Sequence, residues 1–341
     1  MESINNKKAK YKDLTEDKKY SQKWTEYNRA QTKEKLLFFK LIDEILNVIP
    51  ERTYTFGRPR KSLKDMIFCC MIKIYTGASS RRLISDLELA KKAGYIDNVP
   101  HFNTVLNYFD DSGMKIVLDY LITLSALPLK CVEETFAMDA TGFGTHRFDR
   151  WVDAKYKLRA SPQGKFMKAH VTCGVRTNVI TSAIITLGKV NDTTMFNPLL
   201  TETIEHFDVK EICADKGYIS RANLDLATKL GTMPYIPFKS NATGHSRGSP
   251  TWAKMYKLFT ENYEEFAKHY HLRSNVESCF AMIKRKFGDF CRCKSERSMT
   301  NEILCKILAH NLVCLIHEMF ELKIEVDFLA ISKEFPAQKV I

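Results

Sequence analysis

Three acidic residues far apart along the chain are the residues best suited to do chemistry. Asp139 and Asp215 each stand at the end of an expected strand, and Glu277 lies on an expected long helix. If the fold brings them together, their carboxylates can hold two Mg²⁺ ions about 4 Å apart, as two-metal phosphodiester cleavage requires. Most Asp and Glu side chains are only solvated surface charges, so their spacing alone leaves both interpretations open.

The stretch around Glu277 carries polar side chains at helical intervals. Tyr270, Arg273, Glu277 and Lys284 follow one another in steps of three, four and seven residues. At roughly 100° per residue they fall within an arc of about 60°, so one helix face gathers an acid and two bases. Beside this face runs an apolar stripe that would anchor the helix to a sheet, formed by Val276, Phe280, Ile283 and Phe287.

Simpler structural interpretations exist for several of these residues. An Arg273–Glu277 pair at i,i+4 occurs on ordinary amphipathic helices, and Gly288 then permits the helix to end. His170 and Asp192 can approach the three acids as supporting groups. A buried core histidine and a helix N-cap are the simpler interpretations of these two.

From about Thr135 the periodicity changes from helical to alternating, which predicts a sheet. Strand, strand, strand, helix, strand, helix, strand, helix is the expected order, which is that of the ribonuclease H-like α/β fold, a mixed five-stranded sheet flanked by helices. Residues 239–252 are loop-like and mark an insertion that we extend to about 239–262. The expected elements are strands at 135–139, 167–175, 179–187, 210–214 and 233–237, and helices at 193–206 and 220–230.

The N-terminal part predicts a helical domain behind a polar arm. Residues 1–34 are Lys-rich with few aliphatic side chains, which describes a flexible or loosely helical arm. The short helices can form a helix-turn-helix, with Arg81 and Arg82 near the DNA backbone and residues 103–107 on the recognition helix. A small bundle that only packs on its neighbour is an equally good interpretation. The expected helices span 35–48, 62–77, 80–93, 103–109 and 114–124.

The charge balance favours a polyanionic partner. The chain has 52 Lys and Arg against 40 Asp and Glu, a formal charge of +12, and such an excess binds phosphates with release of counterions. The ten cysteines include no C-x-x-C spacing, so no zinc ribbon is expected. No apolar run is long enough to span a bilayer without polar interruption, so we expect an intracellular, cytoplasmic protein. The most apolar stretch, residues 303–320, predicts a buried core helix.

Two further basic zones suit DNA contact. Between the first two strands, cations that include Arg147, Arg150 and Lys165 alternate with aromatic residues. This mixture can follow a phosphate backbone and stack on bases, although a solvated loop is the alternative. Arg58 and Arg60 lie in a Gly-Arg-Pro-Arg-Lys run that is typical of a minor-groove hook.

These residues and their neighbours resemble a known family, the DDE insertion-sequence transposases with the Y-(2)-R-(3)-E-(6)-K signature. The signature is matched by Tyr270, Arg273, Glu277 and Lys284. The resemblance is strong over about residues 130–320 and weak in the helical N-terminal part, and no catalytic position departs from the pattern. Other matching runs are Met-Asp-Ala-Thr-Gly at 138–142, Ala-Asp-Lys-Gly-Tyr at 214–218 and Tyr-Ile-Pro-Phe-Lys-Ser-Asn at 235–241.

The resemblance implies a metal-dependent enzyme that acts on DNA. Asp139, Asp215 and Glu277 would bind two divalent ions, Mg²⁺ or Mn²⁺, per active site. The protein would bind the terminal inverted repeats of its own element as a homodimer, cleave phosphodiester bonds, and join the 3′-hydroxyl ends to target DNA. The residues on this helix that are expected to contact DNA are Tyr270, Arg273, Lys284 and Arg285.

The expected domains are the arm (1–34), a helical DNA-binding domain (35–130), a ribonuclease H-like catalytic domain (131–322) and a C-terminal tail (323–341). Two other functions stay open. One is a metal-dependent nuclease that cuts DNA without strand transfer. The other is a non-catalytic DNA-binding derivative, against which the intact set of three acids argues.

Overall fold

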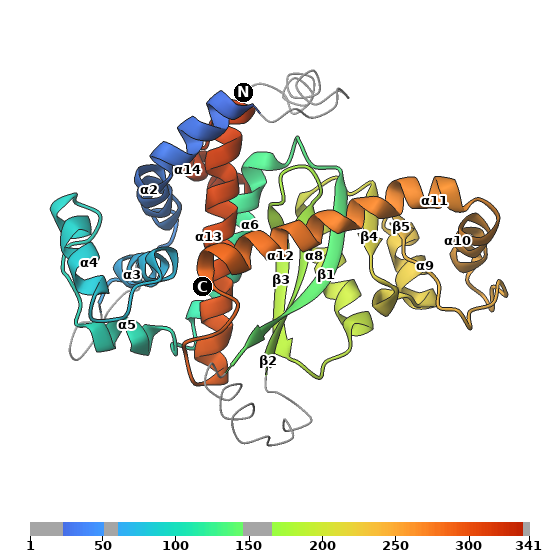
Figure 1. Cartoon of the computed structure of the whole chain (residues 1–341), viewed down its shortest axis with the longest axis horizontal. Helices are drawn as coiled ribbons and strands as arrows, with labels where there is room; N and C mark the ends of the chain where they lie inside the picture. The colour runs from blue at the N-terminus through green and yellow to red at the C-terminus, as the bar shows by residue number, and fades with distance from the viewer. Residues whose placement is uncertain (1–22, 51–60, 146–165, 337–341) are drawn as a thin grey trace. The chain divides into compact units, whose positions relative to one another are not determined.

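A mixed five-stranded sheet forms the centre of the α/β part of the chain. The computed structural model describes residues 23–50, 61–145 and 166–336. The strand order is β3-β2-β1-β4-β5 (Figure 1), and β4 pairs in parallel with both β1 and β5. Strands β2 and β3 are sheet neighbours joined by a tight turn, in which the Gly174 N–H donates to the Val179 carbonyl oxygen at 2.8 Å. The strands are β1 (Thr135–Gly144), β2 (Phe166–Gly174), β3 (Ile180–Leu187), β4 (Glu211–Ala214) and β5 (Met233–Tyr235).

Strand β4 is buried between its neighbours β1 and β5. Ile212, Cys213 and Ala214 are all fully buried, which fits the continuous apolar run of a parallel strand that has no solvent face. The chain leaves the sheet at the next residue, Asp215. The first polar side chain after the buried run is therefore that of Asp215, immediately after β4 ends.

Helices follow the strands in the order that the sequence predicts. α8 (Phe196–His206) packs on β3, α9 (Arg221–Lys229) packs on β5, and α11 (Tyr263–Tyr270) packs on β4 and β5. This arrangement, after an all-helical N-terminal region, confirms the expected ribonuclease H-like fold class. The remaining elements of this part are the 3₁₀ turns η2 (Asp192–Met195), η3 (Lys216–Tyr218) and η4 (His271–Arg273), and helices α10 (Pro250–Glu261) and α12 (Ser274–Phe287).

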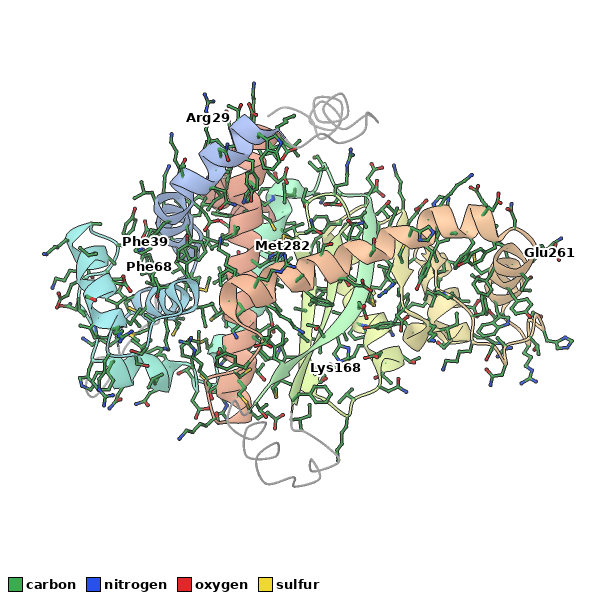
Figure 2. All side chains as sticks on the ribbon, viewed as in Figure 1. Arg29, Phe39, Phe68, Lys168, Glu261 and Met282 are labelled. Atoms are coloured by element: carbon green, nitrogen blue, oxygen red, sulfur yellow. The ribbon has the colours of Figure 1, made fainter. Side chains whose placement is uncertain are left out.

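A second group of helices surrounds α13 (Glu296–Glu321), which packs on α6, α2 and α3. Aromatic side chains join the first two helices of the group, and the rings of Phe39 and Phe68 meet edge to face at 5.8 Å (Figure 2). The other members are α2 (Trp24–Leu46), α3 (Leu63–Thr76), α4 (Leu83–Lys92), α5 (Phe102–Tyr108), α6 (Met114–Ala126) and α14 (Phe328–Glu334), with the turn η1 (Leu127–Leu129).

The ends of α3 follow the predicted capping pattern. The Ser62 side chain accepts a hydrogen bond from the Asp65 backbone N–H at 3.3 Å, as an N-cap residue does. Gly77 ends the helix with φ of 63°, a left-handed conformation that glycine adopts without strain. The prediction of a helix from the Ser62 cap to Gly77 is confirmed.

Helix α13 is a core helix. Within the described residues it is the one helix long and apolar enough to cross a membrane by length and composition, but 72% of its most apolar stretch is buried inside the protein. Its polar side chains have partners: the Lys306 ammonium donates to the Phe290 carbonyl oxygen at 2.7 Å, and the Asn311 amide to that of Ile122 at 3.3 Å. The prediction of a buried core helix over 303–320 is confirmed.

Two expected segments have different bounds in the structure. Helix α2 begins at Trp24 rather than at about Lys35, inside the segment expected to be a flexible or loosely helical arm, because Ala30 and Glu34 are buried and Glu34 accepts a hydrogen bond from the Tyr75 hydroxyl at 2.6 Å. The expected loop insertion at 239–262 ends in helix α10. Ser249 caps this helix by accepting from the Trp252 N–H at 3.1 Å, and the proline that suggested a loop occupies the first helical turn.

The contacts between Cα atoms divide the described chain into two units. Unit 1 comprises residues 129–142 and 168–282. Unit 2 comprises the N-terminal helices up to residue 128, residues 143–145 and 166–167, and residues 283–336. The start of the main part of unit 1 at residue 129 lies close to the expected boundary near residue 131, whereas residues 283–322 of the expected catalytic domain fall in unit 2. The reason is that α13, late in the sequence, forms the core of the N-terminal helices.

Candidate active site

The pairing of β1 with β4 brings Asp139 and Asp215 to the same level of the sheet. The two strands are parallel, and their last paired residues are Met138 and Ala214. Asp139 and Asp215 are the next residues, so they lie at the same level of neighbouring strands. The expectation that Asp139 ends its strand is wrong, because β1 continues beyond its short neighbour β4 to Gly144. Register in a sheet is strict where both faces are buried, which fixes this juxtaposition.

Backbone N–H groups orient both carboxylates. Asp139 Oδ1 accepts from the N–H of Ala140 at 2.8 Å. Asp215 caps the turn η3, and its Oδ2 accepts from the N–H of Gly217 at 3.4 Å. Each carboxylate retains oxygen lone pairs for other partners, since one carboxylate can accept several hydrogen bonds or metal contacts.

The guanidinium of Arg273 links Asp139 with Glu277. One nitrogen, Nη1, donates to Asp139 Oδ2 at 2.6 Å, and the other, Nη2, donates to Glu277 Oε1. The i,i+4 pair expected within this helix is therefore present, and it extends to a carboxylate of the sheet. Asp139 is 21% exposed and Glu277 is 60% exposed, so the site opens towards solvent on the side of the helix.

Mutual repulsion of the three acids is visible at Asp139. Burial raises the pKa of this carboxyl, and the negative charges of Asp215 and Glu277 raise it further, while the Ala140 N–H and the Arg273 charge act in the opposite direction. The net direction is upward. A divalent cation bound between such carboxylates would offset the repulsion among their negative charges.

The three carboxylates are suitable ligands for a hard divalent ion. In the structure, the Arg273 side chain lies between two of them. Carboxylate oxygens are the ligands that Mg²⁺ and Mn²⁺ prefer. Among the described residues, no three His, Cys, Asp or Glu side chains are gathered closely enough to hold an ion. The Arg273 guanidinium instead neutralises Asp139 and Glu277, so binding of an ion by all three acids requires this side chain to move.

The four signature residues are not on one uninterrupted helix. Tyr270 is the last residue of α11, Arg273 ends the 3₁₀ turn η4, and Glu277 and Lys284 lie on α12. The tighter turn shifts Tyr270 from the position that a regular helix predicts. The expected apolar stripe is confirmed at three positions, because Val276, Phe280 and Ile283 are buried.

The signature residues and their neighbours are partly buried to different degrees. Burial raises the pKa of Tyr270, and its ring stacks on Phe266 at 5.8 Å. Burial lowers the pKa of Lys284, against the effect of Asp289. Arg285 is exposed. The other cations expected to contact DNA lie outside the described residues; they are Arg58, Arg60, Arg147, Arg150 and Lys165.

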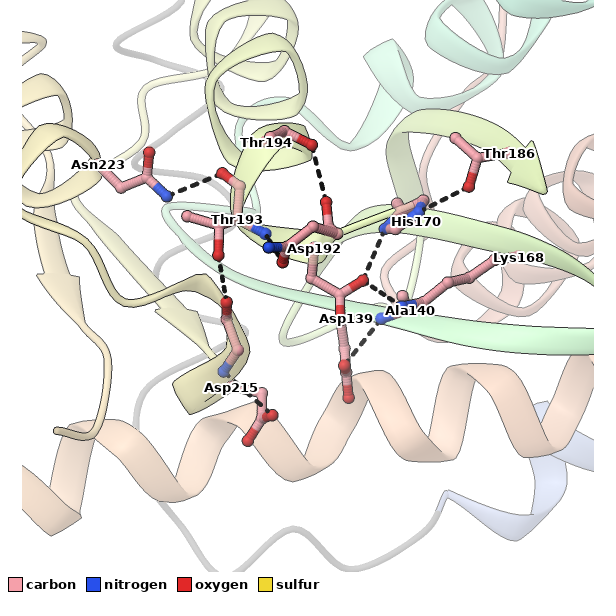
Figure 3. Close-up of polar contacts among 12 residues, drawn as sticks. Asp139, Ala140, Lys168, His170, Thr186, Asp192, Thr193, Thr194, Asp215 and Asn223 are labelled. Atoms are coloured by element: carbon pink, nitrogen blue, oxygen red, sulfur yellow. Dashed lines mark hydrogen bonds and ion pairs between the residues drawn. The ribbon is translucent and has the colours of Figure 1, made fainter. Parts of the chain in front are cut away.

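A charged cluster lies beside the acids, at residues for which the sequence favoured simpler structural roles. Asp192 forms an ion pair with Lys168, and its Oδ1 lies 3.3 Å from Nδ1 of His170, whose pKa burial lowers to about 4 (Figure 3). His170 is fully buried, and its Nε2 lies 3.0 Å from the Thr186 hydroxyl. The expectation of a helix N-cap at Asp192 is wrong by one residue, because Asn191 caps the turn η2. Alternation along β2 puts Lys168 and His170 on one face, which was the available signal.

The turns that carry Asp192 and Asp215 are joined to each other. The Thr193 hydroxyl of η2 donates to the Gly217 carbonyl oxygen of η3 at 2.6 Å. The Asn223 amide donates to the carbonyl oxygens of Thr193 at 3.0 Å and Tyr218 at 2.8 Å. These bonds hold the acid-bearing turns in a fixed relation.

Comparison with known proteins assigns the family. A search of curated proteins found no match. The family model for the transposase DDE domain matches residues 130–312, more than half of the chain and all three acids. Proteins of this kind are transposases and nucleases that act on DNA and typically use divalent metal ions. The chain therefore belongs to the transposase DDE domain family.

Proposed function

We propose that this protein binds the ends of its own mobile element, cleaves phosphodiester bonds there and joins the freed 3′-hydroxyl ends to target DNA. Asp139, Asp215 and Glu277 would hold the divalent ions. The observation that carries the proposal is the level placement of Asp139, within β1, beside Asp215, just after the end of β4, with Glu277 joined to Asp139 through Arg273.

The chemistry divides between the ions and the side chains of the chain. Bound Mg²⁺ or Mn²⁺, two per site, would activate the attacking oxygen and stabilise the leaving one. Arg273 offers a planar fork that matches two phosphate oxygens, and Lys284 offers a point charge seven residues beyond Glu277 on α12. Tyr270 and Arg285 extend this series of DNA contacts along the same stretch.

DNA binding over a larger surface supports the same function. The formal charge of +12 favours phosphate contact. We assign the recognition of the element ends to the helical region of α3 to α6, in which α3 packs on α4 and α5. The Arg81 guanidinium lies 5.0 Å from the centre of the Phe102 ring at the start of α5. Pairing of two DNA ends requires two subunits, so we propose a homodimer on DNA.

A strand-cleavage and joining assay tests the proposal. The donor is DNA that flanks the gene, the buffer contains Mg²⁺, and the variants are Glu277→Gln and, as a matched control, Glu264→Gln at an exposed position of α11. We expect joined products from the wild type and from Glu264→Gln, and a loss of at least about 100-fold for Glu277→Gln, because a metal ligand is lost.

Other product patterns separate the alternatives. Metal-dependent nicks without joined products would favour a nuclease that lacks strand transfer. Equal activity of Glu277→Gln and the wild type, with binding to the donor ends demonstrated for both, would contradict the role of Glu277. Binding to the ends without any metal-dependent product would favour a non-catalytic DNA-binding protein.

A further inference from the structure

The hydroxyl group of Tyr218 is buried next to the acids with no partner. Tyr218 ends the turn η3, three residues after Asp215, and is 1% exposed. Among the residues that the structure describes, no hydrogen-bond partner lies within reach of its hydroxyl oxygen. Buried polar groups are nearly always paired, so an unpaired one requires an explanation.

Three carboxylates influence this hydroxyl. Burial raises the pKa of Tyr218, and the charges of Asp192, Asp139 and Asp215 raise it further. A Cβ atom on Gly217 would lie 3.5 Å from Asp192 Oδ2 and 3.6 Å from Asp215 Oδ2. Asp192 and Asp215 therefore flank the backbone immediately before Tyr218.

The backbone that carries Tyr218 is held on both sides, and its ring lies near another aromatic side chain. The Asn223 amide holds the carbonyl oxygen of Tyr218, and the Thr193 hydroxyl holds that of Gly217. The ring packs near Phe196, with 6.4 Å between ring centres. A phenylalanine would fill the same space without burying an unpaired hydroxyl, so packing does not explain the oxygen.

A phenol is a suitable donor in this position. Its ordinary pKa of about 10 keeps it protonated at neutral pH. Carboxylates only accept hydrogen bonds, and none of the three is within bonding distance of the phenol oxygen. A water molecule between them can accept from the phenol and donate to the carboxylates, since bridging waters connect groups too far apart for a direct bond.

We propose that Tyr218 is a positioning residue of the acidic site, whose hydroxyl donates to a water held among Asp139, Asp192 and Asp215 and so orients the two catalytic carboxylates for divalent ions. The inference rests on the proposed function of Asp139 and Asp215. Asp192, neutralised by Lys168 and placed by His170, supplies the third wall of this water site without being a metal ligand itself.

The test compares Tyr218→Phe with the matched control Tyr235→Phe in the full chain. Tyr235 is also a largely buried tyrosine of unit 1, but its ring stacks on His269 and none of the three acids faces it. Two quantities are measured: the melting temperature without divalent ions, and the affinity for Mn²⁺ by isothermal titration calorimetry.

For Tyr218→Phe we expect a melting temperature equal to or above that of the wild type, because the hydroxyl has no protein partner to lose. We expect its Mn²⁺ affinity to fall about tenfold, in the range seen when groups behind metal ligands are removed. Tyr235→Phe should bind Mn²⁺ as the wild type does.

An unchanged Mn²⁺ affinity in Tyr218→Phe would overturn the inference, whatever its melting temperature. An equal loss of affinity in Tyr235→Phe would overturn it too, because the effect would not belong to Tyr218. Asp215→Asn, titrated in parallel, separates this failure from a failure of the proposed function. If Asp215→Asn binds Mn²⁺ like the wild type, the metal site itself is misplaced; if Asp215→Asn alone loses binding, only the role of Tyr218 is wrong.

Discussion

Arg273 is the side chain that determines the charge balance of the candidate site. Its guanidinium contacts Asp139 and Glu277, and these are two of the three carboxylates that would hold divalent ions. A cation and a guanidinium cannot both occupy the space between these oxygens. We therefore propose that Arg273 competes with metal in the free protein, and that the phosphates of bound DNA would provide the alternative partner that releases it.

Removal of Arg273 should raise metal affinity in the absence of DNA. In Arg273→Gln we expect Mn²⁺ to bind several-fold more tightly than in the wild type, because a positive charge beside the ligands is lost. DNA cleavage should nevertheless fall. Calorimetry measures the affinity, and Lys268→Gln, which removes an exposed cation of α11 paired with Glu265, is the control. A weaker affinity for Mn²⁺ in Arg273→Gln would contradict competition.

His170 should make the free energy of unfolding depend on pH. Burial lowers its pKa to about 4, against the attraction of Asp192 and with the help of Lys168, whereas an unfolded histidine has a pKa of about 6.5. The unfolded chain therefore binds more protons between these values. Stability is complete above pH of about 6.5 and decreases as the pH falls towards 4.

The size of this effect can be measured by urea unfolding at pH 7.5 and 5. We expect the wild type to lose about 2 kcal/mol more than His170→Gln between these pH values. His245→Gln, at an exposed position, should keep the pH dependence of the wild type. A His170→Gln variant with the full pH dependence would show that other groups cause it.

At the scale of elements, Glu133 holds the β2–β3 turn. It is fully buried just before β1, and its Oε1 accepts from the Thr177 N–H and hydroxyl at 2.7 Å each and from the Arg176 N–H at 3.2 Å. A Cβ on Gly174 would lie 2.3 Å from the Glu133 carboxyl carbon, so the glycine makes room for this contact. The hairpin next to β1 therefore depends on one buried carboxylate.

Loss of this carboxylate should destabilise unit 1. In Glu133→Ala we expect the free energy of unfolding to fall by about 3 kcal/mol, because buried N–H groups lose a charged acceptor. The neighbouring Glu134→Ala removes a surface pair with Lys210 and should cost less than about 1 kcal/mol. Chemical denaturation measures both. Equal effects of the two substitutions would contradict the assignment.

The order of elements could be predicted from the sequence because it depends on local pattern. Ser62 and Gly77 mark the ends of α3, and the buried run before Asp215 marks β4. The prediction of an element's bounds failed where a long-range contact extended a helix, or where a residue type that disrupts one kind of structure also begins another. Pro250 breaks a strand or a helix interior but starts α10, and the buried Glu34 extends α2 towards Trp24.

At the scale of the whole molecule, the family and the fold class could be predicted from motifs, but the grouping of α13 with the N-terminal helices could not. Helix α13 follows the catalytic segment in sequence and yet forms the core of the N-terminal helices. The polar contacts of the acids could not be predicted from the sequence either. The contacts of Arg273 with Asp139 and of Asp192 with Lys168 join residues that only the folded chain brings together.

The central claim is that Asp139, Asp215 and Glu277 together hold divalent ions at the site of DNA cleavage. Anomalous X-ray scattering from crystals of the protein bound to donor-end DNA and Mn²⁺ tests this most directly. We predict Mn²⁺ peaks bounded by the three carboxylates, with the Arg273 guanidinium turned from Asp139 to a phosphate. Peaks only at other positions, with Arg273 still between Asp139 and Glu277, would contradict the account.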